Sequence, residues 1–275
     1  MPIQLEISDG VPYWWDSPDI WVVPGNDPNG APDQPVAGQP AFLWAQVQNI
    51  GNQNASGAQV NFYWSNPAAG VLRSNSTLVG SAFVDLGPGE TKDVLCVIPW
   101  VPVIVNNGHE CVVAEVIHSG DPLPAPVPDA FDPPTYRQVA QKNLNVLAMS
   151  AHMMIRAIQI GAPPREDRRL RIAVERGEQL DKKVLARLGL ARHRFAPRAQ
   201  VTAWLSQNSD CEPAERKPPE TVTYDVKRGT VGAVFLKVMP AKLDADTYAV
   251  LRVVARNGEK VMGGVTYVLV NAGEN

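Results

Sequence analysis

The most constraining feature of this sequence is a two-residue alternation of apolar and polar side chains, repeated in short segments. In one segment, Val60, Phe62 and Trp64 alternate with more polar neighbours. Because successive side chains of a strand point to opposite faces, the pattern predicts half-buried strands. The chain of 275 residues also contains 25 prolines, which cut helices short and mark turns. Such a sequence is expected to form antiparallel β-sandwiches.

Further strands are predicted along the first half. Their shared faces carry Leu43, Ala45 and Val47, then Val94, Cys96, Ile98 and Trp100, then Val112, Ala114 and Val116, and finally Leu144 and Val146. We expect the last strand to close a first sandwich. Trp64 is expected in its core, whereas Trp44 is out of phase and faces outwards or meets the second half.

Several motifs of this half follow a known order. DSPDIWV, GQPAFLWAQVQNIGN, GAQVNFYWS, LGPGETKDVLCVIPWVP and NNGHECVVAEV run from about residue 17 to 148. They resemble the cell-adhesion-related bacterial immunoglobulin-like domain, CARDB, in an opening strand, an Asn-Ile-Gly-Asn turn and a Pro-Gly-Glu turn. The insert 119–137 departs from that pattern. The resemblance implies an adhesive or scaffolding module without naming a ligand.

The second half is predicted to be a second β-sandwich with one helix. Strands are expected around 153–160, 168–177, 199–207, 220–229, 232–240, 247–258 and 261–270. Leu180, Val184 and Leu188 repeat every four residues before Gly189, as in a capped helix. Pro240 and the strand from Tyr248 loosely resemble a bacterial immunoglobulin-like module. The sequence thus predicts an all-β chain of two tandem immunoglobulin-like domains, 1–150 and 151–275.

Charge differs sharply between the two halves. Residues 1–150 contain 4 Lys and Arg against 14 Asp and Glu, a net −10, and residues 151–275 contain 21 against 14, a net +7. The basic excess lies within 156–198, with 12 Lys and Arg against 5 Asp and Glu. Such asymmetry suggests two bodies with different surfaces. Either the charges are solvated or paired within the chain, or opposite surfaces attract identical copies head to tail.

Candidate binding residues fall in an aromatic and a basic group. The aromatic group is Tyr13, Trp14, Trp15 and Trp21, and the basic group includes Arg165, Arg168, Arg169, Arg192 and Arg194. Consecutive aromatic residues cannot all enter one core from an extended segment. They form either a carbohydrate or protein anchor or, slightly favoured, a segment packed at the end of a sandwich or between the domains. Nucleic-acid binding is disfavoured by the acidic first half and a pI of about 5.8.

No cofactor or metal site is predicted. His109 and Cys111 lack the paired spacing of a zinc site, so a structural role is expected. The loop from Asp27 to Asp33 lacks the ordered ligands of a calcium loop and is expected to be a polar turn. Cys96 and Cys111 are interpreted as small buried side chains rather than a disulfide.

Catalysis is not expected, because the sequence contains no nucleophile elbow or phosphate loop. Three hypotheses remain: a structural or adhesive module that assembles with itself or another protein in a filament, coat or secretion particle; a carbohydrate- or surface-binding accessory protein; and an enzyme with a dispersed site. No membrane span or signal peptide is visible. The expected compartment is therefore cytoplasmic, or outside the cell as part of a particle.

Overall fold

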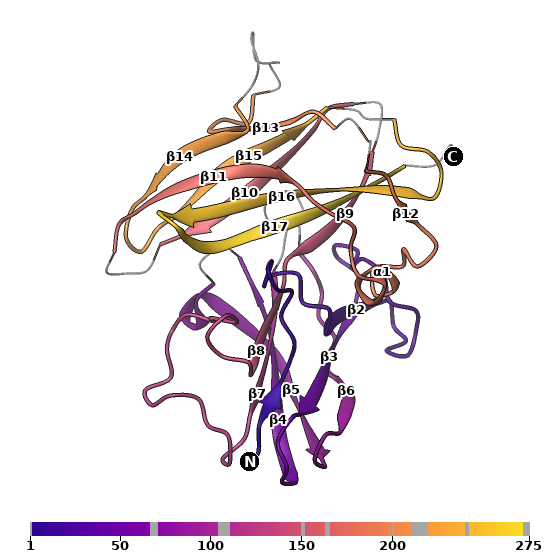
Figure 1. Cartoon of the computed structure of the whole chain (residues 1–275), viewed down its shortest axis with the longest axis vertical. Coiled ribbons are helices and arrows are strands. Elements are labelled where there is room, and N and C mark those ends of the chain that lie inside the picture. Colours follow the sequence, from indigo (N-terminus) through magenta and orange to yellow (C-terminus); the bar gives the residue numbers. More distant parts are fainter. Residues whose placement is uncertain are drawn as a thin grey trace.

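The chain is all-β and forms two sandwiches stacked on each other (Figure 1). A computed structural model describes residues 2–66, 71–103, 111–149, 152–162, 166–197, 199, 201–210, 219–239 and 242–271. The predicted positions His109, Arg165 and Pro240 lie outside these residues. Across the described residues, no helix combines the length and apolarity needed to cross a membrane.

The N-terminal sandwich consists of two four-stranded sheets. One contains β1 (Leu5–Glu6), β2 (Ile20–Pro24), β3 (Ala41–Asn49) and β6 (Thr91–Leu95); the other contains β4 (Ala55–Ser65), β5 (Ser76–Leu86), β7 (Cys111–Ile117) and β8 (Val139–Lys142). All pairings within both sheets are antiparallel. A short 3-10 turn, η1 (Arg73–Asn75), precedes β5.

The core of this sandwich contains the residues that alternation placed there. Leu43 and Val47 of one sheet meet Val60, Phe62 and Val112 of the other. The sequence placed two positions less accurately. Trp64 packs against this core but is only half-buried, and Ile98 is exposed because β6 ends at Leu95. Trp44 faces out of the core, as expected, and stacks on Trp21 with ring centroids 5.7 Å apart. Cys96 and Cys111 are buried free thiols, in keeping with their interpretation as small buried side chains.

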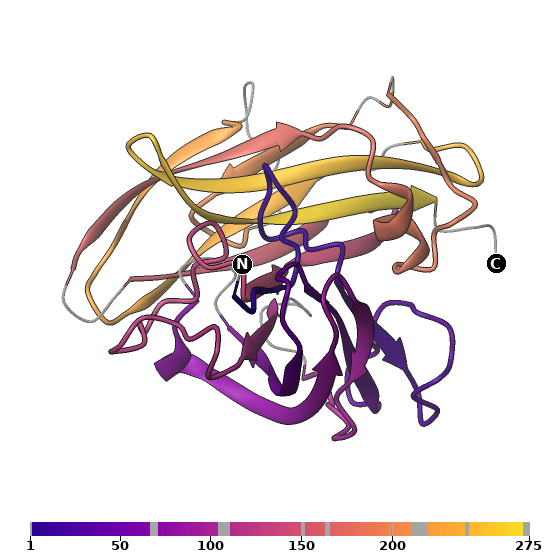
Figure 2. The same cartoon turned by 60° about the horizontal axis from the view of Figure 1, so that its bottom comes forward.

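The C-terminal sandwich pairs a six-stranded sheet with a three-stranded sheet. The larger contains β9 (Leu144–Met149), β11 (Arg168–Arg176), β12 (Arg194–Phe195), β14 (Thr221–Val226), β16 (Thr247–Asn257) and β17 (Lys260–Asn271); the smaller contains β10 (Met154–Gly161), β13 (Ala203–Ser206) and β15 (Val231–Val238). Side chains such as Ile158, Leu236 and Leu251 fill the space between the sheets. The strands of this sandwich run across the end of the N-terminal one (Figures 1 and 2).

The predicted helix is present as α1 (Lys182–Ala186), a single short turn capped by the Asp181 side chain. Leu180, Val184 and Leu188 are buried against the outer face of the large sheet. Gly189 follows with φ of +73°, a conformation that glycine adopts without strain. The three apolar residues therefore pack on one face, as their spacing indicated. They hold α1 at the place where the two sandwiches meet.

The strand expected to close the first sandwich belongs to the second. β9 pairs in parallel with β17, from Leu144 opposite Thr266 to Met149 opposite Asn271. Only Asn143 separates β9 from β8. Alternation predicts that a segment is a strand but does not show which sheet the strand joins. The prediction of a strand here was therefore correct, and its assignment to the first sandwich was wrong.

Candidate functional site

Trp15 is the central side chain of the interface between the sandwiches. It is fully buried, and its indole Nε1 donates a hydrogen bond of 3.1 Å to Oγ1 of Thr266 in β17. A Cβ on Gly264 would lie 2.5 Å from the Trp15 ring, so only glycine fits there. We call this interface the seam; its residues are 8–21, Trp44, Gln46, Asp93, 142–143, 178–188, Arg252, Gly264 and Thr266.

Asp16 forms a buried ionic contact within the seam. Its carboxylate accepts the hydroxyl of Thr266 at 2.7 Å and lies 3.5 Å from Nε of Arg252. Burial raises the pKa of Asp16 to about 6, and the contacts with Thr266 and Arg252 offset only part of that shift. The Arg252 guanidinium also lies 3.8 Å from the centroid of the Tyr13 ring. This buried charge pair therefore joins the two sandwiches.

Asp19 anchors α1 to the N-terminal sandwich. It forms an ion pair with Lys183 and lies 3.6 Å from Nη1 of Arg187. Arg187 also donates to the carbonyl of Pro18, and its guanidinium lies 3.8 Å from the centroid of the Trp21 ring. Basic side chains of the second half thus pair with carboxylates of the first, as one of the two interpretations of the charge split predicted.

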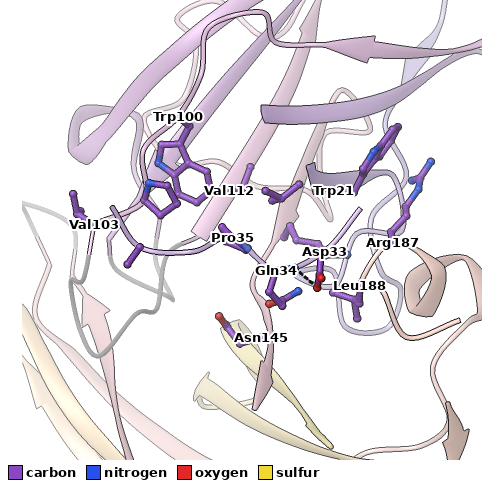
Figure 3. A pocket seen from close by; sticks show the side chains of 14 residues that line it. Trp21, Asp33, Gln34, Pro35, Trp100, Val103, Val112, Asn145, Arg187 and Leu188 are labelled. Atoms are coloured by element: carbon purple, nitrogen blue, oxygen red, sulfur yellow. Dashed lines mark hydrogen bonds between the residues drawn. The ribbon is translucent and has the colours of Figure 1, made fainter. Parts of the chain in front are cut away.

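A small cavity lies in the seam beside Trp21 (Figure 3). Its volume is about 110 Å³, and it is lined by Trp21, Gln34, Trp100, Val112, Lys142, Asn145, Arg187 and Leu188, among others. The Lys142 amine donates to the carbonyl of Ser17, and burial lowers the pKa of Lys142 to about 8. Ligand pockets typically measure roughly 300–1,000 Å³, so this cavity suits a few water-sized molecules.

A larger opening at the seam is of ligand size but of mixed charge. It measures about 580 Å³ and is lined by Asp9, Tyr13, Asp16, Glu178, Leu180, Asp181, Lys183 and Arg252, with neighbouring residues. Partial burial raises the pKa of Asp9. Because Asp16, Lys183 and Arg252 already pair across the seam, most of its charge holds the two sandwiches together.

A third hollow brings a predicted aromatic residue and a predicted arginine together. We call it the Trp14 groove; it measures about 420 Å³ and is lined by Trp14, Val71, Leu72, Ala130, Phe131, Asp132, Pro134, Thr135, Arg168, Lys260, Val261 and Met262. Trp14 is half-buried, with its ring centroid 5.5 Å from that of Trp15. The apolar walls and the two cations give this groove the composition of a binding site.

The remaining candidates are dispersed. Trp15 and Trp21 are buried in the seam, so they cannot form an exposed carbohydrate platform in this conformation. Arg169, Arg192 and Arg194 are exposed, and Arg169 faces Asp225 at 3.9 Å. Two groups of the nine predicted binding residues lie together. Trp14 and Arg168 line the same groove. Tyr13, Trp15 and Trp21 all lie in the seam.

The loop from Asp27 to Asp33 is a turn held by its own side chains. The Asp27 carboxylate accepts the Asn29 N–H at 2.9 Å, and the Asp33 carboxylate accepts that of Gln34 at 2.7 Å. These carboxylates serve the backbone, as expected of a polar turn. In the part of the chain that the structure describes, no cluster of His, Cys, Asp and Glu has the arrangement of a metal site.

Sequence reasoning missed the outer face of β5. Phe83 is 70% exposed and Leu78 is 52% exposed, whereas β5 faces the core with Val79, Ala82 and Val84. Phe83 lies beside Gln59 of β4, whose other neighbour is Ile117 of β7. Two features of the sequence could have indicated this exposed face. The strand contains a single charged residue, Asp85, and its large aromatic residue, Phe83, is out of phase with the residues that face the core.

Comparisons with known proteins leave the family of this chain open. No family model and no curated protein matches the sequence. A CARDB domain from Pyrococcus furiosus, solved with di-metal ions, is 17% identical at a TM-score of 0.29, covering 51% of this chain and 85% of that one. The CupB6 tip adhesin from Pseudomonas aeruginosa is 11% identical at a TM-score of 0.23, covering 91% and 98%. A Paenibacillus cycloisomaltooligosaccharide glucanotransferase is 17% identical at a TM-score of 0.24, covering 47% and 15%. These scores are too low to carry an argument on family or ligand.

Proposed function

We propose that this chain is a non-catalytic structural module that assembles with other copies of itself or with another protein. The observation that carries the proposal is the β5 edge. β5 has eleven residues and, among the strands that the structure describes, pairs only with β4. It exposes Leu78 and Phe83 and contains one charged residue. Natural proteins normally protect such an edge with charges or prolines, because it attracts other chains.

The seam supports the same proposal by fixing the module as one body. Trp15, Asp16 and Asp19 connect the sandwiches through buried hydrogen bonds and ion pairs. A rigid scaffold presents a binding surface without the entropic cost of ordering two domains. Part of the opposite charge excess of the two halves is already paired within the chain. Exposed apolar side chains therefore supply the contact with a partner, and the remaining unpaired charge orients that contact.

The experiment is sedimentation velocity over a range of protein concentrations, at about 50 mM and about 500 mM salt. We expect concentration-dependent association of the full chain, weakened in Leu78→Lys because a lysine places a charge on the apolar surface that β5 exposes. Lys242→Glu, a charge change at an exposed residue that lies outside β5 and lines none of the hollows described above, serves as the matched control. A chain that stays monomeric at both salt concentrations would refute self-assembly, and assembly would then require a different protein.

A further inference from the structure

We infer that Phe83 and Asp85 of one copy dock into the Trp14 groove of the next, so that copies join head to tail. This inference rests on the proposed assembly function and names the two surfaces that meet. Phe83 and Asp85 are two residues apart on β5, so both side chains project from its outer face. We call this pair the β5 knob: an aromatic ring that is 70% exposed, with an exposed carboxylate beside it whose Oδ1 accepts the Gly57 N–H at 2.6 Å.

The groove offers matching chemistry. Its walls include Trp14, Leu72, Phe131 and Met262, which suit an aromatic side chain. Lys260 is exposed and, among the described residues, has no side-chain hydrogen bond or ion pair. An apolar side chain next to a carboxylate is therefore the occupant that this site fits.

The charges of the groove also favour an anionic partner. Arg168 has only a distant contact with Glu166, at 3.6 Å, and its buried Nε has no partner. The one acidic residue in the lining, Asp132, accepts the hydroxyl of Thr135. Two cations against one carboxylate leave the groove positive, whereas Asp85 gives the knob a negative charge.

The two surfaces cannot meet within one chain. The groove includes Leu72, just before β5 begins at Ser76, whereas Phe83 lies seven residues along the strand. At about 3.3 Å per residue, Phe83 lies on the order of 20 Å from the start of β5, beyond the reach of its side chain. Contact must therefore form between copies, and a contact between unlike surfaces propagates into a ring or an open filament.

A mixing experiment tests this geometry directly. Phe83→Ser removes the knob and leaves the groove, and Lys260→Glu reverses the groove charge and leaves the knob. Each variant alone is expected to associate about tenfold more weakly than the unchanged chain. Mixed together, they retain one intact knob and one intact groove, so light scattering should show 1:1 dimers that grow no further.

A second experiment exchanges the charges of residues 85 and 260. Asp85→Lys and Lys260→Glu should each weaken association, and the double variant should recover it, because opposite charges again face each other. Circular dichroism melting checks that each variant folds. If the unchanged chain associates but the mixture forms no dimers and the double variant recovers nothing, the knob binds elsewhere and this inference fails while assembly stands. A monomeric unchanged chain overturns self-assembly and this inference with it, and assembly would then require a different protein.

Discussion

The core of the N-terminal sandwich and the seam both bury large aromatic side chains, yet they hold them differently. Phe62 is surrounded by aliphatic side chains such as Val60 and Leu43. Trp15 instead donates to Thr266, whose hydroxyl donates in turn to Asp16. Apolar packing tolerates exchange of one aliphatic residue for another, whereas a buried polar contact needs each partner in place. The cores thus give stability, and the seam specifies one arrangement of the two sandwiches.

The largest effect should come from truncating these two aromatics. Phe62→Ala and Trp15→Ala are each expected to cost about 3–5 kcal/mol of unfolding free energy, the range for large aromatic residues in cores. Their calorimetric profiles should differ. Phe62→Ala weakens one sandwich, whereas Trp15→Ala uncouples the two and splits unfolding into two transitions. A single transition for Trp15→Ala would show that the seam does not couple the sandwiches.

The ion pairs of Asp19 should come next. Asp19→Ala leaves Lys183 and the mostly buried Arg187 without their main carboxylate. We expect the free energy of unfolding to fall by about 2–3 kcal/mol. This is less than the full cost of breaking a buried ion pair, because Lys183 is 40% exposed. Chemical denaturation measures the loss. Asp225→Ala, which affects only an exposed pair, is the control, and equal losses for both variants would contradict the special role of the seam.

A smaller effect is expected from the protonation of Asp16. Because burial raises its pKa to about 6, the folded state holds this proton more tightly than the unfolded chain, whose Asp pKa is about 4. Stability supplied by the protonated Asp16 is therefore complete below pH 4 and is lost as the pH rises to 6. The difference in unfolding free energy between the unchanged chain and Asp16→Asn should fall by about 2 kcal/mol across that window. A flat difference would show that Asp16 has its ordinary pKa.

The smallest effect should come from the surface pair of Arg169 and Asp225. These side chains are 77% and 64% exposed and 3.9 Å apart. Arg169→Ala should change the unfolding free energy by less than about 0.5 kcal/mol, as for most exposed pairs. Thermal melting in the same buffer as the seam variants gives the baseline for the whole series, and a larger loss would mean that surface charge stabilises this fold.

The sequence predicted strands well because their signal is local. Alternation placed Val60 and Phe62 in a core, and the four-residue spacing from Leu180 located α1. The local pattern could not predict which side chains of a segment are buried, because that depends on contacts with distant parts of the chain. Adjacent Trp14 and Trp15 are equally aromatic, yet Gly264 gives space only to Trp15, and Trp14 lines a groove.

Site residues were harder to predict than strands. The β5 knob was missed because its sequence signal, one charged residue and an aromatic residue out of phase with the core face, does not show whether another element covers that face. The groove draws residues from segments as distant as Trp14, Phe131 and Lys260, which only the packing of two sandwiches brings together. The alternation and turns of the first half predicted a β-sandwich but carried no information on these contacts.

The single residue between β8 and β9 has a mechanical consequence. A load pulling the N-terminal sandwich away from the end of β17 enters β9 at Asn143, with no slack linker to extend first. Because β9 runs parallel to β17, this load acts along both strands in opposite directions. The hydrogen bonds between them then bear the force together in shear instead of opening one after another. A chain joined in this way transmits tension between its two ends as a stiff element.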